Sequence, residues 1–359
     1  MSLSSRLDKY LDTNGLEAAW FAQPNCFAWL TGGNNVIASN GDVGIAAVGY
    51  NGNAITVVTN NIEAERLREE ELRDNIQVVT YEWYKRDLGE AVASISPTPA
   101  AADFEIEGFE TIDASTLRQP LTDDQIGAYR ELSRDTAAAV ERVVRQTHSG
   151  VTELEVAADL RRELEAQGIS TPVILVGGAN RVQRYRHFTP TDASLGEYAL
   201  ISVTVSRDGL YTSATRTVAF DPPNWISERT QAAMRVETTA LAATQAVGIN
   251  GGTADEVFDA IREAYDAVGW GDEWQNHHQG GAAGFAPREW VGTPNCNEPV
   301  FLPQGYAWNP TVQGTKSEDT YLVTATKIEM LSATGEWPTT TVEAVGYDLE
   351  LDRHDILVV

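Results

Sequence analysis

One stretch, YALISVTVSRDGLYTSATRTVAF at residues 198–220, constrains the fold of this chain more than any other. Two runs rich in β-branched and aromatic residues flank Asp208 and Gly209, and an Asp-Gly pair in this setting is a strong signal for a two-residue hairpin turn. A turn at this pair places Val203 directly opposite Ala214, with their Cβ atoms about 5 Å apart. Two carboxylates at such a pair could share two metal ions, whereas valine and alanine offer no ligand atom.

The same order of helical signals occurs twice after residue 121. Each copy has a long helix, a glycine, a Thr-x-x-Glu capping box, a second helix and another glycine. The helices are predicted over about 122–149 and 152–168 in the first copy, and over about 228–247 and 253–269 in the second. Strand-like sequence follows each copy. We interpret this order as an internal duplication with a pseudo-two-fold axis; the alternative is that two common capping boxes coincide.

Residues 1–121 have a different pattern, with short apolar runs between turn signals. A strand is predicted near residue 17, ending at Pro24, and a hairpin over 43–59. A helix over 62–74, a strand over 76–84 and a loop over 94–103 follow. This part is predicted to be a smaller α/β domain, and the helix that begins at Thr122 opens a second domain.

The charge of the chain is strongly negative. Asp and Glu number 52 against 26 Lys and Arg, for a formal charge of −26, and the acidic residues are scattered along the chain. Screening by salt relieves the repulsion within such a chain, so we interpret the surface as suited to high salt, as in the cytoplasm of a halophile. The alternative is a chain that happens to be acidic. In either case nucleic acid and anionic membranes are poor partners.

Two further features favour the cytoplasm. Cys26 and Cys296 are the only cysteines and lie far apart in the sequence, which suits a reducing compartment. No apolar run approaches the roughly 20 residues that a membrane span requires, and the first residues do not read as a signal peptide. We therefore expect a cytoplasmic protein.

Four motifs in this order give the chain a specific resemblance. They are WFAQPNCFAWLTGG (20–33), HSGVTELEVAADLRRELEAQG (148–168), GLYTSATRTV (209–218) and GTKSEDTYLVT (314–324). They are similar to motifs of the superfamily of creatinase, prolidase, aminopeptidase P and methionine aminopeptidase, which has the pita-bread fold. The resemblance implies an α+β protein: a pita-bread domain over 122–359, with a duplicated αβ unit and a curved antiparallel sheet, preceded by a creatinase-type α/β domain over 1–121. It also implies a homodimer.

The superfamily's two metal ions are held by two Asp, one His and two Glu. In this chain the two Asp positions fall on Val203 and Ala214, and the His position falls on Gly281. The first Glu has no equivalent among 309–311, and only Glu318 remains. One ligand of five does not hold a dinuclear site, so we expect no metal at that position and no cofactor.

The resemblance leaves a different set of polar residues. The expected catalytic residues are His187, His277, His278 and Glu318, and the expected substrate-binding residues are Arg288, Glu289, Asn309 and Lys316. Creatinase has the same fold without a metal and relies on histidine and glutamate. By this resemblance a neutral His187 acts as general base on water. A carboxylate then holds a cationic amine or guanidino group, and Arg288 steadies an oxyanion or a substrate carboxylate.

Simpler interpretations stand beside these. Adjacent residues of a strand point to opposite faces, so at most one of His277 and His278 is expected to serve the site. Glu318 could be a remnant paired to Lys316 or to an arginine, and Arg288 with Glu289 could be a structural ion pair. A different register, in which a metal binds through Asp208, one of His277 and His278, and Glu318, is disfavoured because Asp208 belongs to the turn.

The resemblance therefore implies a hydrolase of a C–N bond, in an Xaa-Pro peptide or a small amidino or amide compound, and the replaced ligand positions favour a reaction without the usual dinuclear metal site. The alternative is a catalytically inactive relative that binds a small molecule or serves in assembly. The expected partners are a small molecule or short peptide and a second copy of the chain.

Overall fold

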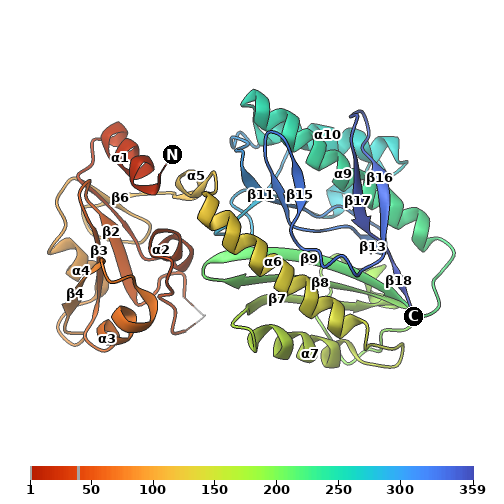
Figure 1. Cartoon of the computed structure of the whole chain (residues 1–359), viewed down its shortest axis with the longest axis horizontal. Coiled ribbons are helices and arrows are strands. Elements are labelled where there is room, and N and C mark those ends of the chain that lie inside the picture. The colour runs from red at the N-terminus through yellow and green to blue at the C-terminus, as the bar shows by residue number, and fades with distance from the viewer. Residues whose placement is uncertain (1, 39–40) are drawn as a thin grey trace. The chain divides into compact units, whose positions relative to one another are not determined.

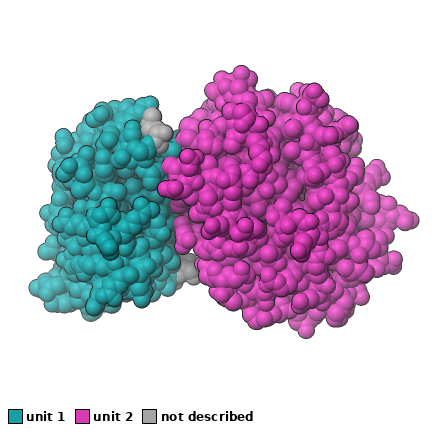
Figure 2. Space-filling model, viewed as in Figure 1, with its two compact units in different colours: residues 1–119 teal, residues 120–359 magenta. Residues whose placement is uncertain are grey.

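The computed structural model describes residues 2–38 and 41–359 and divides the chain into two compact units, residues 1–119 and 120–359 (Figure 2). The two units are described separately. The residues of the expected site all belong to the second unit.

The first unit has a mixed six-stranded sheet in the order β4-β3-β2-β1-β5-β6 (Figure 1). Its strands are β1 (Ala18–Phe21), β2 (Ala46–Tyr50), β3 (Ile55–Asn60), β4 (Gln77–Tyr81), β5 (Ala100–Ala102) and β6 (Glu110–Thr111). Its helices are α1 (Leu3–Asn14), α2 (Pro24–Thr31), α3 (Ala64–Arg66), the π-helical turn η1 (Leu67–Glu71), α4 (Leu88–Ala93) and α5 (Ser115–Arg118).

The predicted hairpin over 43–59 is confirmed as β2 and β3, which pair antiparallel. The loop expected over 94–103 is wrong, because it contains β5, which pairs parallel with β1. β5 is three alanines, all buried. Alanine has low strand propensity, so only the tight packing of small side chains in the finished sheet explains this strand. The helix expected over 62–74 is limited to α3 and η1.

The second unit has two four-stranded sheets, β18-β9-β8-β7 and β10-β11-β14-β15, and two small hairpins. Its helices are α6 (Asp123–Val144), α7 (Glu153–Glu165), α8 (Ala179–Val182), α9 (Ile226–Asn250), α10 (Ala254–Ala267) and the 3₁₀ turn η2 (Glu273–Asn276). Strands β7 (Ser170–Gly178), β8 (Tyr198–Arg207) and β9 (Leu210–Ala219) precede α9. The later strands are β10 (Gly280–Ala283), β11 (Gln304–Trp308), β12 (Thr311–Val312), β13 (Thr315–Lys316), β14 (Tyr321–Val323), β15 (Ile328–Met330), β16 (Thr339–Glu343), β17 (Glu350–His354) and β18 (Leu357–Val358).

The repeated order of elements is confirmed. The pair α6 and α7 precedes the antiparallel strands β7, β8 and β9, and the pair α9 and α10 precedes the antiparallel sheet of β10, β11, β14 and β15 (Figure 1). Thr122, Thr152 and Thr253 each form the predicted capping box with the residue three positions later. In both copies these boxes satisfy backbone N–H groups that the first helical turn leaves unpaired.

Some helix ends differ from the prediction: α6 ends at Val144 rather than near residue 149, and α7 ends at Glu165 rather than at residue 168. Helix α9 was expected to end near Gly248, but it continues to Asn250 and ends at Gly251, which has the left-handed φ of 69°. Gly248 lies inside the helix. A Cβ at this position would come within 2.7 Å of the Leu302 side chain, so the site requires glycine. Its role is close packing, whereas Gly251 supplies the C-cap conformation.

The hairpin of residues 198–220 has the predicted register. Asp208 and Gly209 have φ of 53° and 77°, the left-handed values that a two-residue type I′ turn needs. Val203 pairs with Ala214, and the register is continuous from Arg207 to Tyr198. The position of the expected metal site within β8 and β9 is therefore fixed by the turn.

No helix in the described part of the chain is long and apolar enough to cross a membrane. Cys26 and Cys296 are both free thiols, the first buried and the second partly exposed.

Salt is expected to stabilise this protein. With a formal charge of −26, the folded chain repels itself more than the expanded one, and the Debye length falls from about 10 Å at 0.1 M salt to about 3 Å at 1 M. The melting temperature should rise steadily over this range of KCl. Sucrose at equal osmolality is the control, because it is excluded from the protein surface but does not screen charge. A melting temperature independent of KCl would contradict the interpretation of the surface as suited to high salt.

Candidate functional site

The strand pair β8 and β9 brings Val203 and Ala214 side by side, both fully buried. Neither side chain carries a ligand atom. Gly281 lies on β10, and a Cβ there would come within 2.1 Å of the backbone oxygen of Trp290. A histidine at 281 would therefore require the backbone to move. The backbone of Trp290 leaves no room for a side chain at the position that corresponds to the metal-binding histidine of the superfamily.

Glu318, the one retained ligand position, is buried and fully engaged. Arg288 donates to Oε1 at 2.9 Å. Lys316 Nζ lies 2.7 Å from Oε2, and the Thr215 hydroxyl donates to the same oxygen at 2.9 Å. Burial alone would raise the pKa of Glu318, but the charges of Lys316 and Arg288 lower it below its ordinary value. Glu318 is thus a buried carboxylate neutralised by two cations, with both oxygens occupied.

The alternative interpretation of Glu318 as a residue paired to Lys316 or to an arginine is therefore confirmed, with both partners present. Two cationic side chains contact the carboxylate that metal ions would contact in the superfamily. We name Lys316, Glu318 and Arg288 the buried charge triad.

Hydroxyl groups of β8 and β9 surround the triad. Arg288 also donates to Ser213 Oγ at 3.3 Å, and Lys316 Nζ lies 3.4 Å from Ser202 Oγ. Ser202 and Thr215 are hydrogen-bonded to each other at 2.7 Å. The sequence analysis did not identify these residues as part of the site. Hydroxyl residues in a strand are also expected where they have no functional role.

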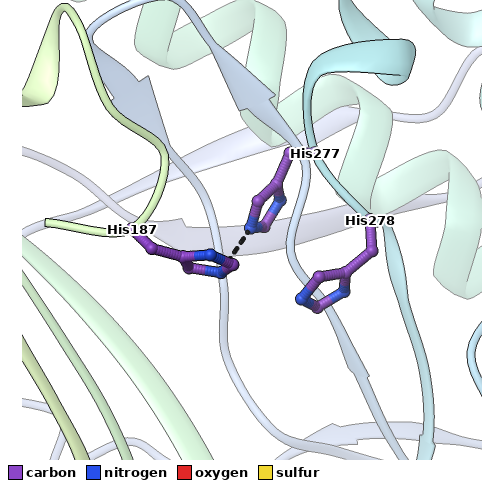
Figure 3. Close-up of side chains that lie close together, drawn as sticks. All are labelled: His187, His277 and His278. Carbon is purple, nitrogen blue, oxygen red and sulfur yellow. Dashed lines mark hydrogen bonds between the residues drawn. The ribbon is translucent and has the colours of Figure 1, made fainter.

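Three histidines meet beside the triad. His277 Nε2 lies 3.3 Å from His187 Nε2, and Figure 3 shows the His277 and His278 rings on the same side, turned toward His187. The rings of His277 and His278 are stacked, with centroids 4.5 Å apart and planes 27° apart. His277 is buried, whereas His187 and His278 are exposed.

The expectation that His277 and His278 point to opposite faces is wrong. It assumed a strand, but η2 ends at Asn276 and β10 begins only at Gly280. The two histidines lie in the irregular segment between them, where side chains need not alternate. Both therefore lie within reach of His187.

The electrostatic surroundings keep these imidazoles neutral. Burial lowers the pKa of His277 to about 2 and that of His278 to about 4, and nearby cations, including Lys316, lower both further. Burial and Lys316 also lower the pKa of His187, while Glu318 opposes them. At neutral pH all three rings offer lone pairs.

A cavity of about 590 Å³ opens next to His187. It is lined by Gln183, Arg184, Tyr185, Arg186, His187, Glu273, Asn276 and Gln313. Arg186 forms an ion pair with Glu273, whereas Arg184 forms none with any described residue. The cavity therefore has an excess positive charge, although the whole chain is strongly negative.

The other expected substrate-binding residues are buried near β10 and β11. The backbone N–H of Glu289 donates to Ala282 at 2.8 Å, and the backbone N–H of Asn309 donates to Gln279 at 2.9 Å. Among the described residues, Asn309 Oδ1 has no hydrogen-bond partner. The expected role of Glu289 and Asn309 in binding substrate stays a prediction.

The superfamily's pair of metal ions does not fit these residues. Val203, Ala214 and Gly281 supply no ligand atom, no side chain fits at 281, and both oxygens of Glu318 already contact Arg288, Lys316 or Thr215. Oxygen-rich divalent sites need several ligands around each ion. The cationic ends of Lys316 and Arg288 would in addition repel such ions.

Comparison with known proteins gives a consistent result. Residues 127–325 match the profile of metallopeptidase family M24. An uncharacterized peptidase of Staphylococcus saprophyticus is 27% identical over 243 residues, which cover 64% of this chain and 67% of that protein.

Solved structures share the fold. The prolidase from Pyrococcus horikoshii matches with a TM-score of 0.75 at 17% identity, over 92% of this chain and 98% of that one. An Xaa-Pro dipeptidase from Bacillus anthracis matches with a TM-score of 0.74 at 16% identity, over 99% of both chains. The pita-bread fold expected from the sequence is thereby confirmed.

Proposed function

Since this chain belongs to metallopeptidase family M24, we propose that it hydrolyses a C–N bond without the family's pair of metal ions. The observation that carries this proposal is the buried charge triad, in which Lys316 and Arg288 hold Glu318 where family members hold ions. The neighbouring histidines are left as the groups able to activate water.

His187 is the proposed general base. In the tautomer in which its Nε2–H donates to His277 Nε2, the Nδ1 of His187 keeps a free lone pair. Water gives a proton to that nitrogen as its oxygen attacks the carbon of the C–N bond. The C–N bond then breaks, and the leaving nitrogen takes the proton back from His187.

The charge of the cavity bears on the substrate. Glu318 has no free oxygen for a cationic amine or guanidino group, and the excess charge beside His187 is that of Arg184. A carboxylate is the natural partner of such an arginine. This favours a short peptide with a free carboxylate, such as an Xaa-Pro dipeptide, over a cationic amidino compound.

A test compares turnover of metal-free protein on Xaa-Pro dipeptides in molar KCl. We expect turnover that chelator does not abolish, and His187→Ala should lower kcat/KM by about 10²–10⁴-fold, the usual contribution of general base catalysis. His148→Ala is the matched control, because His148 is exposed and outside the histidine cluster. Turnover that depends on added Mn²⁺ and survives in His187→Ala would contradict the proposal.

A binding protein is the second candidate. It is favoured by Glu318, since neither of its oxygens is free to orient a water or a substrate. Absence of turnover on peptides and amides, together with a higher melting temperature in the presence of a dipeptide, would support it. The same outcome would exclude hydrolysis of that peptide. The homodimer and the cytoplasmic location remain proposals that rest on the resemblance and composition alone.

A further inference from the structure

The three histidines have a geometry that base catalysis alone does not require. His187, His277 and His278 each offer one ring nitrogen, and these three atoms lie within 4.8 Å of one another. The rings come from two segments, the loop after α8 and the irregular stretch between η2 and β10, and converge from different sides (Figure 3).

One pair already has the separation of metal ligands. With Zn–N bonds of about 2.0–2.1 Å, two nitrogens of a tetrahedral site lie about 3.3–3.4 Å apart. The Nε2 atoms of His187 and His277 are 3.3 Å apart. The ligating nitrogen of the third ring, that of His278, lies within 4.8 Å of the other two, and this exposed ring has to move nearer to them to complete the site.

The charges near the histidines are mixed. Arg186 is paired with Glu273, and Lys316 and Arg288 share the one carboxylate of Glu318, whereas Arg184 on the adjoining cavity is paired with no described residue. The affinity for a cation therefore has to come from the three nitrogen ligands. Neutral imidazole is the form that binds metal ions. Nitrogen ligands select ions such as Zn²⁺, Cu²⁺ or Ni²⁺ over Mg²⁺, Ca²⁺ or Mn²⁺, which prefer oxygen.

We propose that His187, His277 and His278 form a mononuclear site for Zn²⁺ or a similar transition-metal ion, with a fourth position open to solvent. The site differs from that of the family, because it uses none of the positions 203, 214, 281 and 318. If the proposed function holds, a bound ion takes up the His187 ring that would act as base. Zn²⁺ is then an inhibitor of the metal-free reaction.

Titration of metal-free protein with Co²⁺ in molar KCl tests the site directly. We expect one Co²⁺ per chain, with the intense visible bands of four-coordinate cobalt, displaced by one equivalent of Zn²⁺. His278→Ala should weaken Co²⁺ binding by at least about 100-fold, because it removes a ligand, and even an outer-shell change costs 10–100-fold. His278 is exposed, so this variant should fold, and His148→Ala is the control.

Weak, pale six-coordinate binding that His278→Ala leaves unchanged would identify adventitious binding by surface carboxylates and overturn the site. The absorption bands do not depend on turnover. A chain that binds cobalt in this way but hydrolyses nothing therefore refutes the proposed function and keeps the site. A chain that hydrolyses the dipeptide but shows no four-coordinate cobalt bands refutes the metal site and keeps the proposed function.

Discussion

Replacing Arg216 by methionine is expected to lower the free energy of unfolding by about 3–5 kcal/mol, because it leaves buried carboxylates without their cation. Arg216 is fully buried on β9 and donates to Glu141 of α6 at 3.0 Å and to Asp319 at 3.0 Å. It also donates to the backbone oxygen of Ser332 at 2.7 Å. One side chain thus joins α6 and β9 to segments from the second copy of the duplication.

The same arginine supports the candidate site. Arg216 donates to the backbone oxygen of Thr215, and the Thr215 hydroxyl donates to Glu318. Arg216 also pairs with Asp319, the residue that follows Glu318 in the sequence. Burial would raise the pKa of Asp319, but the charges of His354 and Arg216 lower it below its ordinary value, so the carboxylate stays charged at neutral pH. Loss of Arg216 should therefore also disturb the position of Glu318.

The control is Arg142→Met, the same substitution at an exposed position of α6, the helix that carries Glu141. Arg142 pairs with Glu163 at 2.6 Å, but its side chain is 51% exposed. Exposed pairs contribute at most about 1 kcal/mol, and molar salt reduces this further. Urea unfolding of both variants at constant KCl gives the comparison. Equal losses for the two variants would show that the buried network does not stabilise the fold.

The sequence predicted those parts of this site that local chemistry determines. The Asp208-Gly209 turn fixed the register of β8 and β9 and so the pairing of Val203 with Ala214, and the resemblance to the superfamily assigned its two Asp positions to that pair. Capping boxes gave the helix starts for the same reason, since the first turn has unpaired N–H groups wherever it occurs.

The remainder depends on contacts between distant segments. Arg216, Glu141 and Asp319 are separated by at least 75 residues, and no local pattern indicates that they meet. The direction of the His278 side chain depends on where η2 ends and β10 begins. The sequence prediction placed His278 in a strand and therefore gave the wrong direction. The packing role of Gly248 likewise became visible only beside Leu302.

Replacing Glu318 by glutamine is expected to cost about 3–5 kcal/mol of stability, more than replacing Lys316 by methionine. The triad has two cations and one anion, so Glu318→Gln leaves Lys316 and Arg288 buried together without a counter-charge. Lys316→Met instead leaves one neutral pair, Arg288 with Glu318, and should cost only about 1.5–3 kcal/mol, the usual range for a hydrogen bond to a charged group.

The stability of the double variant measures the coupling between Lys316 and Glu318, on which the proposed metal-free site depends. Combining Lys316→Met with Glu318→Gln removes the repulsion between the two cations, so it should be more stable than Glu318→Gln alone. Lys327→Met is the matched control, because Lys327 is exposed and lies 3.6 Å from Glu329. Costs that simply add would mean that Glu318 is not held by Lys316. In that case Glu318 would be free to serve as a ligand, and the premise of a metal-free reaction at this position would fail.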